Sequence, residues 1–171
     1  MQINTVRFGQ VEIDESKIIT FNEGLPGIED RKSFAILHFE DSYPIIWLQS
    51  LDDEGICLPV TDTFTVWPEY AFELEDKDAE EIGIDSVGDL HVLSVLLIPE
   101  KLEMMTINLV APIVINMTNG MGKQVVLSSS EYNIRQPVFS EIIRVMKEQE
   151  ATQGGVNKEG KADAGSVKED K

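Results

Sequence analysis

The chain can form no intramolecular disulfide, because its 171 residues include a single cysteine. That residue, Cys57, lies in the apolar run ICLPV. A reactive thiol needs a neighbouring base or an electropositive setting, and the surrounding sequence offers neither. We therefore expect Cys57 to be a small buried hydrophobic residue of a protein that works in a reducing compartment.

Positive charge is scarce as well. The chain has 14 Lys and Arg residues against 31 Asp and Glu residues, which gives a formal net charge of -17. Nucleic acids and anionic lipids are bound mainly through Lys and Arg side chains that displace counterions. The charge balance therefore predicts no direct binding to nucleic acid or to a membrane surface.

Long apolar runs are also missing. The longest, VLSVLLI, covers residues 92–98, whereas a bilayer-spanning helix needs about 20 apolar residues. The opening residues MQINTVRFG have neither the cationic segment nor the apolar core of a signal peptide. We therefore expect a cytoplasmic protein.

Residues suited to catalysis or metal binding are few. The two histidines, His38 and His91, are far apart in the sequence, and neither stands at a spacing typical of metal ligands or of a catalytic triad. The three serines at 128–130 lack the flanking glycines of a nucleophile elbow. The sequence therefore predicts no catalytic residue, no cofactor and no metal site.

The chain does contain many short runs of Val, Ile, Leu and Phe, separated by Gly, Pro, Asp and Asn. This pattern predicts a mainly β fold, an antiparallel β barrel or barrel-like sandwich, in one domain of residues 1–150. Several runs are apolar at consecutive positions, which favours strands covered on both faces. The expected strands are residues 3–8, 11–14, 18–21, 33–39, 45–49, 56–61, 70–74, 91–98, 106–110, 113–117 and 124–128.

Two helices are expected beside the strands. The first is short, over residues 78–82, with Asp78 and Glu81 at capping-box spacing and Gly83 as the stop. The second covers residues 139–150, and we expect its apolar face to pack on the barrel because isolated helices of this length are marginally stable. That face repeats at i, i+3, i+4 and i+7 and consists of Phe139, Ile142, Ile143 and Met146.

From residue 151 the composition changes to Gly, Lys, Glu, Asp, Ala and Ser, with few aliphatic residues and no aromatic one. Such a segment cannot bury enough apolar surface to offset the entropy lost on ordering. Residues 151–171 are therefore expected to form a disordered charged tail.

Residues 69–89 are strongly acidic, with nine carboxylates against the single base Lys77 and hence a local net charge of -8. One interpretation is a solvated face that aids solubility. The other is a docking surface that steers a basic protein towards this one. A calcium site is a third possibility, but the spacing of an EF-hand loop is absent.

Two further segments indicate architecture or contact, not chemistry. Residues 24–29, GLPGIE, place glycines around Leu25 and Pro26 and predict a rigid turn that shapes the rim of the barrel or is itself contacted. Residues 108–118, NLVAPIVINMT, place an apolar run with a central proline between two asparagines, Asn108 and Asn116.

These two segments also carry a family resemblance. Together with WLQS at residues 47–50, QVVL at 124–127 and YNIRQP at 132–137, they resemble the flagellar assembly factor FliW family. The five blocks occur in the family's order and the resemblance spans about residues 3–138. The tail beyond residue 151 is longer and richer in Gly, Lys and Glu than the family pattern implies.

The resemblance implies a cytoplasmic, monomeric, non-enzymatic protein without a cofactor. Members of the family bind flagellin and the carbon storage regulator CsrA, a small dimeric repressor that binds mRNA. When flagellin is exported, the freed factor binds CsrA and relieves its block on flagellin translation. The residues expected to contact these partners are Leu25, Pro26, Glu73, Glu75, Asp76, Glu80, Glu81, Asn108, Ile113 and Asn116.

The residues alone leave a second class of function open, a small-ligand-binding or enzymatic β barrel with an internal cavity. The two classes differ in the interior of the barrel. A sealed apolar interior favours the regulatory protein, whereas an open mouth lined by histidine and carboxylates favours the enzyme.

Overall fold

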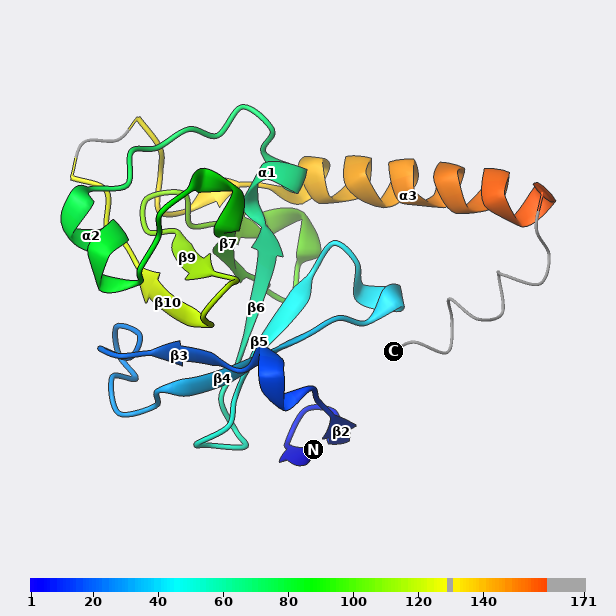
Figure 1. Ribbon diagram of the computed structural model, residues 1–171. Helices are drawn as coiled ribbons and strands as arrows, with labels where there is room; N and C mark the ends of the chain where they lie inside the picture. Colours follow the sequence, from blue (N-terminus) through cyan, green and yellow to red (C-terminus); the bar gives the residue numbers. More distant parts are fainter. Residues whose placement is uncertain (129–130, 160–171) are drawn as a thin grey trace.

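A closed β barrel forms the centre of the computed structural model, which describes residues 1–128 and 131–159 (Figure 1). The prediction of a mainly β barrel is confirmed. Seven strands make up the barrel: β3 (Ile19–Phe21), β4 (Ser33–Leu37), β5 (Ile46–Ser50), β6 (Cys57–Asp62), β7 (Leu90–Leu97), β9 (Ile113–Asn116) and β10 (Met121–Gln124).

The strands follow the order β7-β6-β5-β4-β3-β10-β9, and β9 pairs back with β7 to close the barrel. Each described barrel pair is antiparallel except β10 with β3, which is parallel. The expectation of an antiparallel barrel therefore needs this one correction. Closure matters because it pairs the strands that would otherwise be sheet edges.

Apolar side chains fill the interior of the barrel. The rings of Phe21 and Phe34 meet edge to face with centroids 5.4 Å apart, and neither side chain is exposed. Around them pack further side chains from β5, β6, β7 and β9, including Leu48, Val60, Leu93, Ile113 and Ile115. The described interior of the barrel is therefore packed with apolar side chains.

The outer face of the barrel is covered on two sides, as the runs of consecutive apolar residues predict. A hairpin of β1 (Gln2–Thr5) and β2 (Gly9–Glu12) covers β4 and β5, where Phe8 packs against Trp47 with ring centroids 5.4 Å apart. On another side, residues 66–84 and the C-terminal helix cover Val92 and Val114. As a result, all five residues of β5 and all four of β9 are buried.

The C-terminal helix α3 (Phe139–Glu159) begins against the barrel and then projects away from it (Figure 1). Its first turns pack as expected, but the buried face consists of Ile142 and Val145, together with Val138 just before the helix, and Met146 is 37% exposed. The helix also continues beyond the expected end at residue 150. The last part of the expected tail, residues 160–171, lies outside the described residues.

Several short elements had no clear pattern in the sequence. These are α1 (Thr63–Val66), β11 (Gln136–Pro137) and four 3₁₀ turns, η1 (Glu15–Lys17), η2 (Glu40–Ser42), η3 (Val87–Asp89) and η4 (Leu102–Met104). Each of these elements spans at most about one period of its pattern, which is too short for a repeat to be recognised in the sequence. The strand expected at residues 106–110 is present but shorter, as β8 (Thr106–Ile107). Conversely, the strand expected at residues 70–74 is absent, and of the strand expected at residues 124–128 only Gln124, the last residue of β10, is in a strand.

Candidate functional site

The acidic segment, residues 69–89, crosses the outside of the barrel between α1 and β7 and contains the helix α2 (Asp76–Glu81) (Figure 1). Its exposed carboxylates face solvent and can act on a partner at a distance. They belong to Glu69, Glu73, Glu75, Asp76, Glu80 and Asp85. Four of the five acidic residues expected to contact partners, Glu73, Glu75, Asp76 and Glu80, are therefore brought onto one surface.

The fifth, Glu81, is paired within the chain. Lys123 of β10 lies with its Nζ 2.8 Å from Asp78 Oδ1 and also contacts Glu81. The Lys123 side chain is only 17% exposed, and its hydrogen bonds with Asp78 and Glu81 raise its pKa. Two carboxylates of the acidic segment thus hold α2 on the barrel instead of facing a partner.

This ion pair corrects the expected capping of α2. The helix begins at Asp76, with Glu75 at the N-cap position and no side-chain hydrogen bond there. Asp78 lies inside the helix, where its carboxylate binds Lys123. The spacing of Asp78 and Glu81 reflects a shared lysine on a distant strand, and a capping box was the wrong interpretation.

The other end of α2 matches the sequence prediction and explains Asn116. Gly83 has φ 67 and stops the helix, with its N–H donating to Glu80 O and that of Ile84 to Ala79 O. The Asn116 amide, 2% exposed, donates to the carbonyls of Ile82 at 2.8 Å and Gly83 at 3.0 Å. Asn116 therefore anchors the end of α2, and a partner docking on the folded surface would not reach it.

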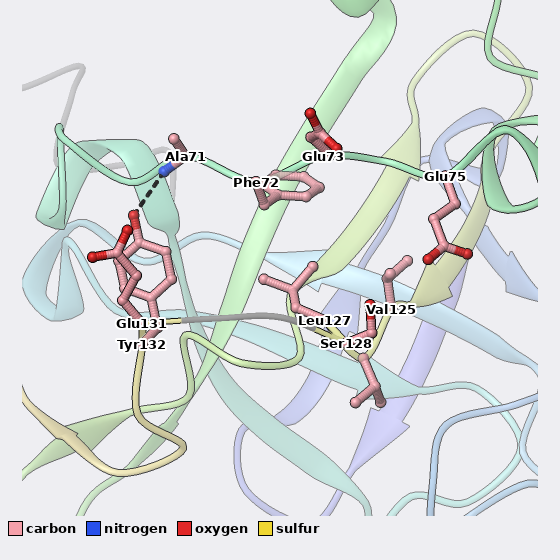
Figure 2. Close-up of a pocket in the computed structure, with 10 residues that line it drawn as sticks. Ala71, Phe72, Glu73, Glu75, Val125, Leu127, Ser128, Glu131 and Tyr132 are labelled. Atoms are coloured by element: carbon pink, nitrogen blue, oxygen red, sulfur yellow. Dashed lines mark hydrogen bonds between the residues drawn. The ribbon is translucent and has the colours of Figure 1, made fainter.

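Beside α2 the surface is hollowed into a groove of about 460 Å³ between residues 71–75 on one side and residues 125–128, 131 and 132 on the other (Figure 2). We call it the acidic groove. Phe72 and Leu127 lie at its centre, with Glu75 and Val125 at one end and Glu131 and Tyr132 at the other. It is lined by Ala71, Phe72, Glu73, Glu75, Val125, Val126, Leu127, Ser128, Glu131 and Tyr132.

Two tyrosines fix the walls of the acidic groove. Tyr132 Oη accepts a hydrogen bond from the Ala71 N–H at 3.0 Å (Figure 2). Tyr70 stacks on Tyr132 with ring centroids 4.7 Å apart and donates its hydroxyl to Leu109 O at 2.8 Å. Burial raises the pKa of Tyr70, so the hydroxyl remains a donor at neutral pH.

Sequence reasoning missed most of this groove. It singled out Glu73 and Glu75 for their charge, but not Phe72, Glu131 or Tyr132, which the fold brings to the same place. The available signal was the alternation of apolar and acidic residues over 70–75, which places one set inward and the other outward.

The remaining candidate contact residues are mostly structural. Leu25 is 2% exposed and Ile113 is fully buried, so both belong to the core. Asn108 Oδ1 accepts hydrogen bonds from the N–H groups of the residues two and three positions later, at 3.0 and 3.1 Å. Pro26 is exposed, at the tip of a tight turn in which Ile28 N donates to Leu25 O at 2.9 Å.

The residues with reactive side chains have structural surroundings. Burial raises the pKa of the Cys57 thiol to about 11, which keeps it protonated and unreactive at neutral pH. His91 Nε2 lies 3.1 Å from Asp62 Oδ2, and Asp62 also accepts from Thr65 N at the start of α1. Burial lowers the pKa of His38.

Metal ligands do not gather in the part of the chain that the structure describes, where no group of three or more His, Cys, Asp or Glu side chains could hold an ion. Among residues 1–128 and 131–159, no helix is both long and apolar enough to cross a bilayer.

Comparison with known proteins gives one family. The family model described as FliW protein matches residues 2–138. The flagellar assembly factor FliW of Thermosipho africanus is 42% identical over 136 residues, which cover 79% of this chain and 93% of that protein. The flagellar assembly factor FliW of Bacillus subtilis is 38% identical over 141 residues, covering 82% of this chain and 99% of that protein.

The fold agrees with the sequence comparison. A crystal structure of the flagellar assembly factor FliW superposes with a TM-score of 0.76 at 32% identity, and covers 81% of this chain and 97% of that one. The region that the family model matches, residues 2–138, contains the barrel, the acidic segment and the acidic groove.

Proposed function

Since the chain belongs to the FliW family of flagellar assembly factors, we propose that it is a non-enzymatic, cytoplasmic regulator that acts by binding other proteins. The proposed partners are flagellin and the translational repressor CsrA. Binding of CsrA would relieve its block on flagellin translation. The match of the family model over residues 2–138 is the observation that carries this proposal.

The charge of the folded body supports a basic partner. Residues 1–146 hold 25 acids and 9 bases, a net charge of -16, whereas residues 147–171 hold 6 acids and 5 bases, a net charge of -1. Opposite charge steers association and raises the rate of encounter. A repressor that binds mRNA through basic residues is the kind of protein that such a body would attract.

The same charge supports displacement of RNA through protein contact. An acidic surface repels the phosphate backbone, so the protein would not compete for RNA itself. It would occupy CsrA, and RNA would leave because a bound acidic body and a bound phosphate chain repel each other. The exposed residues Glu73, Glu75, Asp76 and Glu80 are the proposed contacts, and Pro26 is the exposed apolar candidate.

Gel filtration of mixed purified proteins tests this function. The full chain would be mixed separately with purified CsrA and purified flagellin and analysed by gel filtration with light scattering. The proposal predicts a monomer that forms a complex with each protein. A chain that elutes alone in both mixtures at micromolar concentration would rule the proposal out.

A further inference from the structure

We propose that the acidic groove holds a short segment of a basic protein partner, in which two Lys or Arg side chains flank an aliphatic one. The inference rests on the proposed function, because it names how a basic partner would be recognised. The binding site consists of residues 71–75, Val125, Leu127, Glu131 and Tyr132, and does not include the acidic helix α2.

The carboxylates around the groove set the charge of its occupant. Glu73 and Glu75 come from one wall and Glu131 from the other end (Figure 2), and all three residues are exposed. Cations are therefore favoured at two separate positions, since charge-assisted hydrogen bonds to carboxylates are the strongest polar contacts available there. An acidic or phosphorylated segment would be repelled at both.

The apolar side chains between the carboxylates set the rest of its chemistry. Phe72, Val125 and Leu127 line the groove between the acidic ends, and Val126 beside them is 68% exposed. Lys and Arg can lay their aliphatic stems on such a surface while their charged heads reach the rim. The rings of Phe72 and Tyr132 add a favourable face for a cation.

The groove is also preformed, which lowers the entropy lost on binding. The hydrogen bond from Ala71 N to Tyr132 Oη joins the two walls, and the one from Tyr70 Oη to Leu109 O fixes the ring of Tyr70, which packs against Tyr132. Residues 125–127, which follow β10, are held in place by backbone hydrogen bonds, because Val125 N donates to Pro112 O and Leu127 N to Val110 O, both at 2.9 Å.

The test compares two double variants that change the charge equally. Glu73→Gln/Glu75→Gln removes two carboxylates that line the groove, and Asp76→Asn/Glu80→Gln removes two exposed ones on α2 next to it. The probe is a fluorescent hexapeptide that alternates lysine with isoleucine, with a glutamate–isoleucine hexapeptide as the control ligand. Fluorescence anisotropy at about 0.15 M salt measures the affinity, where long-range charge is largely screened.

We expect the lysine peptide to bind the unaltered full chain and the glutamate peptide not to bind. The groove variant should lose about tenfold or more in affinity, and the α2 variant less than about threefold, because only the first loses direct contacts. A lysine peptide that fails to bind overturns the inference. So does an equal loss in the two variants, which would indicate attraction by overall charge.

A second pair of variants tests the position within the groove without removing an acid. Val126→Lys and Val6→Lys each add one positive charge at an exposed valine, with 68% and 76% of the residue exposed, and only Val126 lies at the groove. The first should weaken lysine-peptide binding by about tenfold and the second should leave it nearly unchanged. Equal effects would contradict the assigned site.

CsrA serves as a second probe that separates this inference from the proposed function. If the unaltered chain does not bind CsrA, the proposed function fails, whatever the peptides do. If it binds CsrA but the groove variant binds as tightly as the α2 variant, the inference fails alone. A selective loss of CsrA binding in the groove variant supports both.

Discussion

The side-chain amide of Asn116 joins β9 to the end of α2, which lies more than 30 residues earlier in the chain. Its nitrogen binds two carbonyl oxygens, and its oxygen accepts a hydrogen bond from Thr118 N at 3.0 Å. Because the side chain is 2% exposed, water cannot replace these bonds when the amide is removed. Leaving a buried polar group of this kind without a hydrogen-bond partner substantially lowers the free energy of unfolding.

Asn116→Ala should therefore lower the free energy of unfolding by about 2–3 kcal/mol. Asn119 provides the matched control, since its exposed amide donates one hydrogen bond of 3.1 Å to the same Ile82 carbonyl. Asn119→Ala should cost less than about 1 kcal/mol. Urea denaturation followed by tryptophan fluorescence measures both, and equal losses would argue against the anchoring role of Asn116.

Cys57 gives a second test at the residue scale. Its pKa of about 11, raised by burial, leaves the thiol protonated at pH 8, where the thiolate is the reactive form. Alkylation by iodoacetamide at pH 8 should be on the order of a hundredfold slower in the folded chain than in guanidinium, and should accelerate as the pH rises towards 11. A folded-state rate equal to that of the unfolded chain would show a reactive cysteine.

At the scale of elements, α2 is held by one lysine. Lys123 reaches Asp78 and Glu81 from β10, whereas Lys77, on α2 itself, is 79% exposed and lies 4.0 Å from Glu81. Ion pairs of exposed lysines contribute little, but removing one partner of a mostly buried group leaves uncompensated charge. The two lysines share a partner and differ in burial.

Lys123→Met should lower the free energy of unfolding by about 2 kcal/mol, and Lys77→Met by less than about 0.5 kcal/mol. The folded state raises the pKa of Lys123 above its ordinary 10.5, so its stabilising effect is complete below that pH and decreases as the pH rises further. Urea denaturation measures the difference in the free energy of unfolding between the unaltered chain and Lys123→Met. This difference should be constant from pH 7 to 10 and decrease at higher pH. A difference in the free energy of unfolding that increases above pH 10.5 would contradict the raised pKa of Lys123.

The strands also show which parts of the fold the pattern of apolar residues can predict. Strands with continuous apolar runs, such as β5, β7 and β9, were predicted near their positions because both of their faces are buried. Residues 70–74 alternate like a strand, and Tyr70, Phe72 and Leu74 do cover the core, yet the segment is not a strand. Alternation reports which side chains are buried, but it does not report backbone pairing.

The same limit explains the candidate site. Charge is visible in the sequence, so Glu73, Glu75, Asp76 and Glu80 were correctly expected at the surface. Burial of Ile113 and the pairing of Glu81 with Lys123 depend on contacts between distant segments. The groove likewise joins two segments that are at least 50 residues apart in the sequence, and no local pattern specifies that contact.

At the scale of the whole molecule, the described interior of the barrel is apolar and the charged groups lie on its outside. The interior is packed with apolar side chains, and the net charge of -16 belongs to residues 1–146. The family match covers the same body. An apolar core inside a predominantly negative surface suits a protein that binds its partners through that surface and selects them by charge.

The rate of association with CsrA tests this account most directly. One variant neutralises Glu73, Glu75, Asp76 and Glu80 as amides, and its control neutralises four exposed acids elsewhere, Glu15, Glu54, Glu100 and Glu103. Stopped-flow fluorescence would give the association rate constant at about 0.05 and 0.5 M salt, since screening removes steering at the higher salt.

The account predicts that at low salt the first variant associates at least about tenfold more slowly than the unaltered chain and that its rate depends less on salt, whereas the control variant is slowed much less. The rates should converge at high salt. An association rate that is the same for the unaltered chain and the first variant at low salt would contradict the account and reduce the acidic segment to a feature of solubility.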